Sequence, residues 1–405
     1  MAFWILSAGL ILLTLTNTIV IEPFLSIIHN TKETIALIIC FLFFTYVYNF
    51  KHKRLFQINK SLSLFVFFAI FSINASPKIK LIYNTQNLGN FWEWKALAVI
   101  LAYYLFYLSF SHVRFSLKEK EKLCKVLATT AIISSIYAIL QALGLDQAQS
   151  TKTIQQIGTP VAPGITAMIG NPTYLGIYLT ACLPFVWHFF KKPVSIIVLT
   201  AIALSGSDTA YLGMLLMAFL WVFSSTGKNG KIVLSFFGFL LCVILAFYHP
   251  KVTDSGRFNQ WKQSLSEFYN PPISMNITPE MSTAQKEEIQ KLNTKKYTIT
   301  GLGLGSFPIF HNANKKFTNP STAWMSAHNV FLEVLFTTGI LGLLIFLSAI
   351  FETFFSYFKK QNKNKIDGLA FISFIFLLLS FFTTSTILLE PLRFLTVIFF
   401  CLISF

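Results

Sequence analysis

Charged residues are the most notable shortage in this chain. Only 12% of its 405 residues are Asp, Glu, Lys or Arg, and 54% are hydrophobic. A soluble domain carries about 25% charged residues, so this composition excludes an ordinary soluble protein. Acidic residues are the scarcer kind, with 16 against 32 lysines and arginines, and the net charge is +16.

Long apolar runs take the place of charge. About 20 apolar residues cross a hydrocarbon core about 30 Å thick, and a helix satisfies its own backbone there. We therefore predict an all-α polytopic membrane protein with about 12 transmembrane helices and one large periplasmic loop between helices 9 and 10. The predicted spans are 3–22, 34–50, 61–76, 94–112, 123–144, 173–190, 193–206, 208–225, 231–248, 328–357, 367–387 and 391–405.

The predicted spans divide the chain into three parts. Residues 1–248 hold spans one to nine, residues 249–327 form the large loop with short surface helices, and residues 328–405 hold spans ten to twelve. The first residues open straight into an apolar run, so we expect a retained span rather than a signal peptide.

Cysteine is also scarce, and no cofactor motif is visible. The five cysteines all lie in predicted spans, so no disulfide framework is expected in the outward loops. No Cys-His spacing indicates a metal site. The glycine-rich run at 301–305 lacks the Gly-Lys-Ser ending of a nucleotide-binding loop. We therefore predict neither a metal nor a cofactor.

The excess of positive charge follows the predicted topology. Lysine and arginine gather in alternate loops, those after spans two, four, six, eight and ten. Basic loops stay in the cytoplasm, which predicts cytoplasmic termini and an outward position for the loop at 249–327. No basic groove interleaved with aromatic residues appears, so we expect membrane lipids rather than a nucleic acid as partners.

The large outward loop carries two patterns. Apolar residues between 258 and 268 recur at helical spacing, which predicts a short helix with one apolar face on the membrane surface. A glycine-rich turn follows at 301–307. The apolar face of the predicted helix comprises Phe258, Trp261, Leu265 and Phe268.

A spaced histidine pattern begins where this loop gives way to the tenth span. It reads His328-Asn329, nine residues, Gly339, two residues and Gly342. Histidine titrates near neutral pH and can take a proton from an attacking sugar hydroxyl. Glycines within a span let a neighbouring helix or a lipid tail approach closely. His328 is therefore a candidate base, although an interfacial histidine with packing glycines is the plainer interpretation.

Arg257 and Arg393 are candidate cations. Arg257 opens the predicted surface helix, and arginine holds a diphosphate through two parallel hydrogen bonds; contact with lipid headgroups is the alternative. Arg393 lies three residues from Glu390 at the outward start of the last span. There a structural ion pair is favoured over phosphate binding.

A tight outward turn between spans seven and eight holds Asp208 and Tyr211. An aspartate that begins a helix is often a cap. A tyrosine here can stack on a sugar, but a place in the aromatic belt of the membrane interface is favoured.

These segments together resemble the O-antigen ligase and polymerase family. The resemblance covers about residues 150–395, whereas the first four spans match only in hydropathy. It implies transfer of a glycan from undecaprenyl diphosphate to an acceptor at the periplasmic face of a bacterial inner membrane, without nucleotide or metal. The segments that carry it are His328-Asn329 with Gly339 and Gly342, the run at 301–307, Gly256-Arg257 with Trp261, and residues 170–175.

The resemblance also implies roles for individual residues. Arg257 would bind the diphosphate, and His328 would activate the acceptor hydroxyl. Many family members carry arginine where this chain has Asp208, so this chain loses one phosphate contact, and either another cation compensates, the donor differs or activity is reduced. The remaining substrate-binding residues would be Asn329, Arg393, Asn171, Gly303, Gly305, Trp261 and Tyr211.

The predicted function is thus a metal-independent membrane glycosyltransferase that inverts the anomeric carbon. An O-antigen ligase with lipid A–core as acceptor is favoured. A Wzy-type O-antigen polymerase, with another glycan as acceptor, and a protein O-oligosaccharyltransferase stay open, as does a relative that only binds the lipid-linked glycan. A polysaccharide exporter or flippase is the alternative from another class, but it predicts charged residues deep within several spans or inverted repeats.

Overall fold

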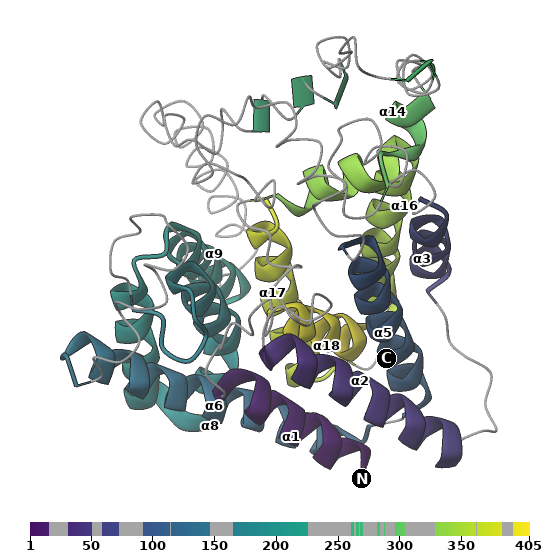
Figure 1. Cartoon of the computed structure of the whole chain (residues 1–405). Coiled ribbons are helices and arrows are strands. Elements are labelled where there is room, and N and C mark those ends of the chain that lie inside the picture. Colours follow the sequence, from purple (N-terminus) through teal and green to yellow (C-terminus); the bar gives the residue numbers. More distant parts are fainter. Residues whose placement is uncertain are drawn as a thin grey trace.

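The structure is a computed structural model, and its regular structure is α-helical throughout the residues that it describes (Figure 1). These residues are 1–15, 31–50, 59–72, 92–113, 115–145, 165–225, 261–262, 265–266, 268–269, 282–283, 287, 296–303, 329–361, 363–382 and 392–405. The helices are α1 (Ala2–Leu15), α2 (Thr31–Phe50), α3 (Lys60–Ser72), α5 (Trp92–His112), α6 (Leu117–Ala142), α8 (Pro172–Ser205), α9 (Asp208–Ser225), α14 (Lys296–Thr300), α16 (Val330–Lys359), α17 (Lys365–Ser380) and α18 (Leu392–Ser404).

The predicted spans coincide with these helices, except that the ninth, 231–248, lies outside the described residues. Among the described residues, three helical segments are long and apolar enough to cross a membrane, namely Leu117–Ala142, Pro172–Phe190 and Val330–Lys359, and the apolar segments of the other helices are shorter. This supports a multi-pass membrane protein, while the number of twelve spans stays a prediction.

The chain reverses its direction within α8. A straight helix of its 34 residues would be about 51 Å long. Yet the Ser207 hydroxyl, just beyond one end, donates to the carbonyl oxygen of Thr173 at the other end over 3.4 Å. The two ends therefore lie together, and α8 is a helical hairpin. This agrees with the two separate spans predicted at 173–190 and 193–206.

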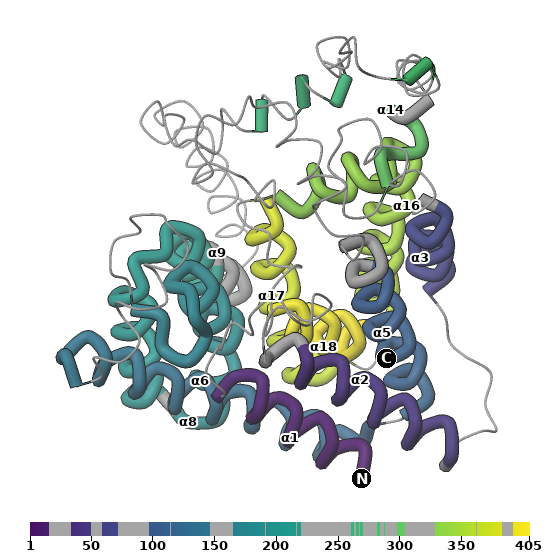
Figure 2. Tube along the Cα trace, in the orientation of Figure 1, coloured from purple at the N-terminus to yellow at the C-terminus, as the bar shows by residue number. Residues whose placement is uncertain are grey.

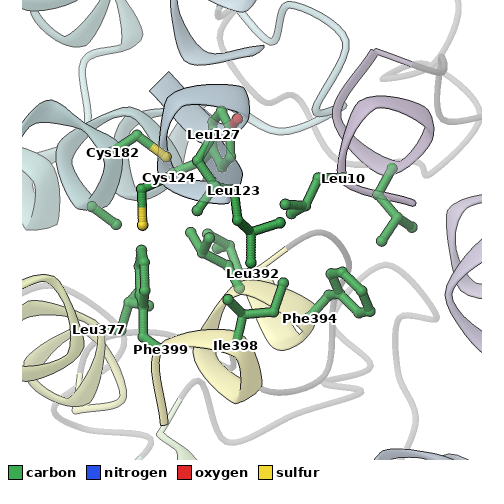
Figure 3. Packing of buried hydrophobic residues seen from close by; sticks show 14 of the residues in the cluster. Leu10, Leu123, Cys124, Leu127, Cys182, Leu377, Leu392, Phe394, Ile398 and Phe399 are labelled. Carbon is green, nitrogen blue, oxygen red and sulfur yellow. The ribbon is translucent and has the colours of Figure 1, made fainter. Parts of the chain in front are cut away.

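The last helix, α18, lies at the centre of the main hydrophobic core. A helix that is apolar on all sides belongs in the interior of a large protein, and nearly every side chain of α18 is buried. Phe399 stacks on Phe185 of α8 with ring centroids 5.5 Å apart, and Phe394 contacts Phe106 of α5. Figure 3 shows residues of α18 facing Leu123 and other side chains of α6.

Helix ends that are predicted to share one side of the membrane do lie together. On the predicted cytoplasmic side, the Asp367 carboxylate at the start of α17 pairs with Lys360 at 3.0 Å and with Lys120 at 3.7 Å. On the other side, the Val330 amide at the start of α16 donates to the carbonyl of Phe381 over 2.9 Å. The contacts thus support the predicted alternation, and the assignment of one side to the cytoplasm stays a prediction.

The buried Asp367 carboxylate offers a test of this packing. Asp367→Asn retains an acceptor for the Asn364 amide but removes the negative charge between two lysines. Breaking a fully buried ion pair costs about 3–5 kcal/mol, and because the Lys360 side chain is 25% exposed we expect a loss of roughly 1–3 kcal/mol. The thermal unfolding midpoint of the purified protein should fall, while Glu287→Gln, at an exposed acid, should leave it unchanged. Equal midpoints for both variants would contradict this.

Candidate functional site

The helix that follows His328, α16, is broken at Gly339. Within α16, Gly339 has φ 69° and ψ −173°, a backbone region that is essentially restricted to glycine. Figure 1 shows α16 bending near its N-terminal end. The part after the break, about 20 residues long, measures about 30 Å and matches the hydrocarbon core. The predicted span at 328–357 is therefore present as α16, but its helix is broken at Gly339.

We call residues 330–338 the leading half-helix. The second half of α16 runs beside α3 (Figure 2). An added Cβ at Gly342 would collide with the Thr338 side chain of the same helix, and it would also meet Phe68 of α3 at 3.3 Å. Gly342 therefore makes room for Thr338 as well as for α3, whereas Gly339 breaks the helix.

Residues 301–303, a glycine-rich segment of the large loop, bind backbone carbonyls next to the break. The amide of Leu302 donates to the carbonyl of Phe336 over 2.7 Å, and that of Gly303 donates to the carbonyl of Thr337 over 3.0 Å. These carbonyls lie in the turn before the break, where helical partners are lost. Irregular backbone near membrane depth is tolerated where protein covers it. The loop segment after α14 provides that cover.

Gly301 and Gly339 face each other directly at this contact. Gly301 and Gly303 have φ values of 79° and 97°. A Cβ added to Gly301 would collide with the backbone of Thr337 and Gly339, and one added to Gly339 would collide with the carbonyl of Ile299. Backbone therefore packs on backbone here. We call Gly301, Gly303 and Gly339 the glycine junction.

A small hydrophobic cluster fastens a second segment of the loop to the leading half-helix. Residues 261–262, 265–266 and 268–269 are helical, and the Phe268 ring lies 5.2 Å from the Phe336 ring. Trp261 packs against the same group. We call this group the loop cluster; its buried members are Phe268, Leu302, Leu332, Leu335 and Phe336.

The loop cluster corrects one expectation from the sequence. The apolar face of the loop helix was expected to lie on the membrane surface, but Phe268 is buried against α16 and Trp261 is half-buried there. Leu265 is exposed, and Phe258 lies outside the described residues. Trp261 thus has a packing role, and its predicted contact with substrate stays a prediction.

Asn329 caps the leading half-helix. Its side-chain oxygen accepts from the Leu332 amide over 3.1 Å, and its side-chain nitrogen donates to the carbonyl of Phe382 over 3.3 Å. The side chain is buried. Both of its polar atoms therefore bind the protein itself, and the side chain ties the start of α16 to the end of α17.

Three predicted site residues, His328, Arg257 and Gly305, lie outside the described residues. His328 directly precedes Asn329, and Arg257 lies four residues before Trp261. Asn329 and Trp261 both lie in the same part of the molecule, around the leading half-helix and the loop cluster.

Asn171, Asp208 and Tyr211 lie at the ends of α8 and α9. Asn171 caps α8 by accepting from the Thr173 amide over 2.9 Å, and the Tyr211 hydroxyl donates to a carbonyl near the end of the same helix. Ser207, rather than Asp208, caps α9 through the Ala210 amide. Asp208 is exposed in the first turn, where the positive end of the helix dipole favours an acid.

Arg393 is buried in the core rather than displayed at a surface. It is 7% exposed, and its guanidinium lies 5.7 Å from the centre of the Tyr103 ring. Glu390, its predicted ion-pair partner, lies outside the described residues. A guanidinium over an aromatic face is held electrostatically, so Arg393 has a packing role in addition to any predicted contact with phosphate.

Sequence reasoning missed the contact between Gly301 and Gly339. Both glycines belong to predicted motifs, but nothing in the sequence links the two motifs. The separation of 38 positions in sequence gives no local signal of their contact, which appears only in the backbone contacts of the folded protein. Among the described residues, no three His, Cys, Asp or Glu side chains gather as metal ligands.

Comparison with known proteins adds one finding. Residues 193–347 match the family model described as O-antigen ligase. The matched region runs from the second arm of the α8 hairpin through the large loop to the second half of α16, and it includes the glycine junction and the loop cluster. No curated protein gives a significant match to the chain.

The cap at Asn329 can be tested against its predicted contact with substrate. Loss of an N-cap costs about 0.5–2 kcal/mol, so Asn329→Ala should lower the thermal unfolding midpoint. Asn329→Ser keeps an acceptor for the start of the helix and loses the donor to Phe382 without burying a charge, so it should retain more of the stability. If both variants unfold like the parent but lose activity, Asn329 acts on substrate rather than on the half-helix.

Proposed function

We propose that this protein, whose residues 193–347 match the family model described as O-antigen ligase, transfers a glycan from undecaprenyl diphosphate to an acceptor at the periplasmic face. This match supports a membrane glycan transferase of the ligase and polymerase type. The observation that carries the finer proposal is the loop cluster, because it joins the segment after Arg257 to the segment after His328.

The reach of the chain keeps the two candidate residues close to this cluster. Four residues of fully extended chain span at most about 14 Å, which limits the distance of Arg257 from Trp261. His328 lies four residues before Leu332, another residue packed in the cluster. A basic group and a candidate base are therefore expected on the same face of the protein.

The proposed chemistry is a single displacement at the anomeric carbon. The oxygen of the acceptor hydroxyl forms the new glycosidic bond while the bond from that carbon to the diphosphate oxygen breaks. His328 takes the hydroxyl proton, and Arg257 stabilises the charge on the departing diphosphate. One displacement inverts the configuration.

The preferred acceptor is lipid A–core, in line with the ligase description of the matched domain. The proposed location is a bacterial inner membrane with both termini in the cytoplasm. The lysines around Asp367 support this orientation, because basic residues favour the cytoplasmic side.

Complementation of a strain without its own ligase tests the catalytic assignment. His328→Ala and Arg257→Ala should each lower attachment of glycan to lipid A–core at least about 100-fold, since a base contributes 10²–10⁴-fold. His112→Ala and Lys262→Ala are matched controls outside the proposed chemistry. An assay with purified lipid-linked glycan and either lipid A–core or a second glycan separates ligase from polymerase. If both test variants attach glycan at the parental level, the catalytic assignment is wrong.

The acid at Asp208 gives a gain-of-function test. Asp208→Arg restores the residue that many relatives carry, and one hydrogen bond between charged groups is worth about 1.5–3 kcal/mol. We therefore expect kcat/KM for the lipid-linked donor to rise roughly tenfold. Asp208→Ala, which only removes the negative charge, is the control. Equal donor kinetics for the two variants would show that this turn does not face the diphosphate.

A further inference from the structure

We propose that Gly301 and Gly339 are positioning residues, which set the loop helix after Arg257 at a fixed distance from the half-helix after His328. For its chemistry this inference rests on the proposed function. Its structural basis is the glycine junction, where two segments 38 positions apart meet backbone to backbone.

Direct backbone contact makes the junction a rigid spacer. A contact between long side chains can adjust through their rotamers, but Gly301 and Gly339 have no side chains to move. The Leu302 and Gly303 amides also bond to the carbonyls before the break. The position of residues 301–303 along α16 is therefore fixed by two hydrogen bonds and by the close approach itself.

Leu302 links the junction to the loop helix. Its amide donates to Phe336, while its side chain belongs to the loop cluster with Phe268. Phe268 in turn contacts Phe336. Any shift of residue 302 along α16 therefore moves the surface on which the loop helix packs, and with it the segment that leads back to Arg257.

The other end of the leading half-helix is fixed independently. The Asn329 side chain donates to the Phe382 carbonyl, and the Val330 amide donates to that of Phe381. The half-helix is thus held by α17 at the His328 end and by the glycine junction at Gly339. The junction then controls where the loop helix lies relative to a half-helix whose start is bonded to α17.

This arrangement predicts an effect on turnover rather than on binding. The donor and the acceptor are each bound by their own part of the proposed site. The displacement, however, requires the two parts to lie at the correct distance from each other. A misplacement of about 1 Å can cost about 10²-fold in rate. A Cβ at either glycine forces such a shift, because it would collide with backbone rather than with a movable side chain.

The test compares Gly301→Ala and Gly339→Ala with Gly368→Ala in the purified full-length protein. The nearest atom to a Cβ at Gly368 is the Tyr357 hydroxyl at 3.8 Å, so this control has room. With undecaprenyl-diphosphate glycan and lipid A–core as substrates, we expect kcat to fall roughly 10- to 100-fold for the two test variants. The donor KM should change less than about threefold, and Gly368→Ala should match the parent.

Leu302→Ala covers the case in which a glycine variant does not fold. It keeps both backbone hydrogen bonds and removes only the link to the loop cluster, so kcat should fall with little change in donor KM. Parental kcat in folded glycine variants, or in Leu302→Ala, overturns the inference while the proposed function stands, provided that His328→Ala is inactive. A raised donor KM with parental kcat also overturns it. Activity in both His328→Ala and Arg257→Ala rejects the proposed function instead.

Discussion

The backbone groups freed by a break in a helix must find new partners, and the outer part of this protein is organised around that requirement. The break at Gly339 leaves the carbonyls of Phe336 and Thr337 without their helical donors. Near membrane depth an unsatisfied backbone group costs several kcal/mol. The amides of residues 302 and 303 satisfy both carbonyls. A segment of the large loop is therefore bound to one depth beside α16.

The same break reconciles the length of α16 with a membrane. A straight helix of its 30 residues would measure about 45 Å, longer than a hydrocarbon core of about 30 Å. After the break the remaining residues match that core. The leading half-helix is bound by α17 at its start and by the loop cluster along its length. One glycine thus separates the part of α16 that crosses the membrane from the part beside the proposed chemistry.

Hydropathy predicted most of the fold, because each span must be apolar over its whole length whatever it contacts. It also separated the two arms of the α8 hairpin. It did not predict the break in α16, since apolar residues continue on both sides of Gly339. Polar residue types indicated candidate sites, but Asn329, Asn171 and Tyr211 bond to the protein's own backbone. Short polar side chains at helix ends suit caps as well as substrates, and sequence alone does not separate the two uses.

The acid at Asp208 makes precise placement more important in the proposed reaction. Stabilisation of a departing diphosphate falls with distance from each cation, and many relatives are expected to share it between two arginines. Arg393 is buried over Tyr103, and Arg257 is the candidate cation of the large loop in the proposed reaction. If a single cation stabilises the diphosphate, no second cation compensates for an error in its position. A spacer made of backbone, as at Gly301 and Gly339, is the kind of contact that keeps such an error small.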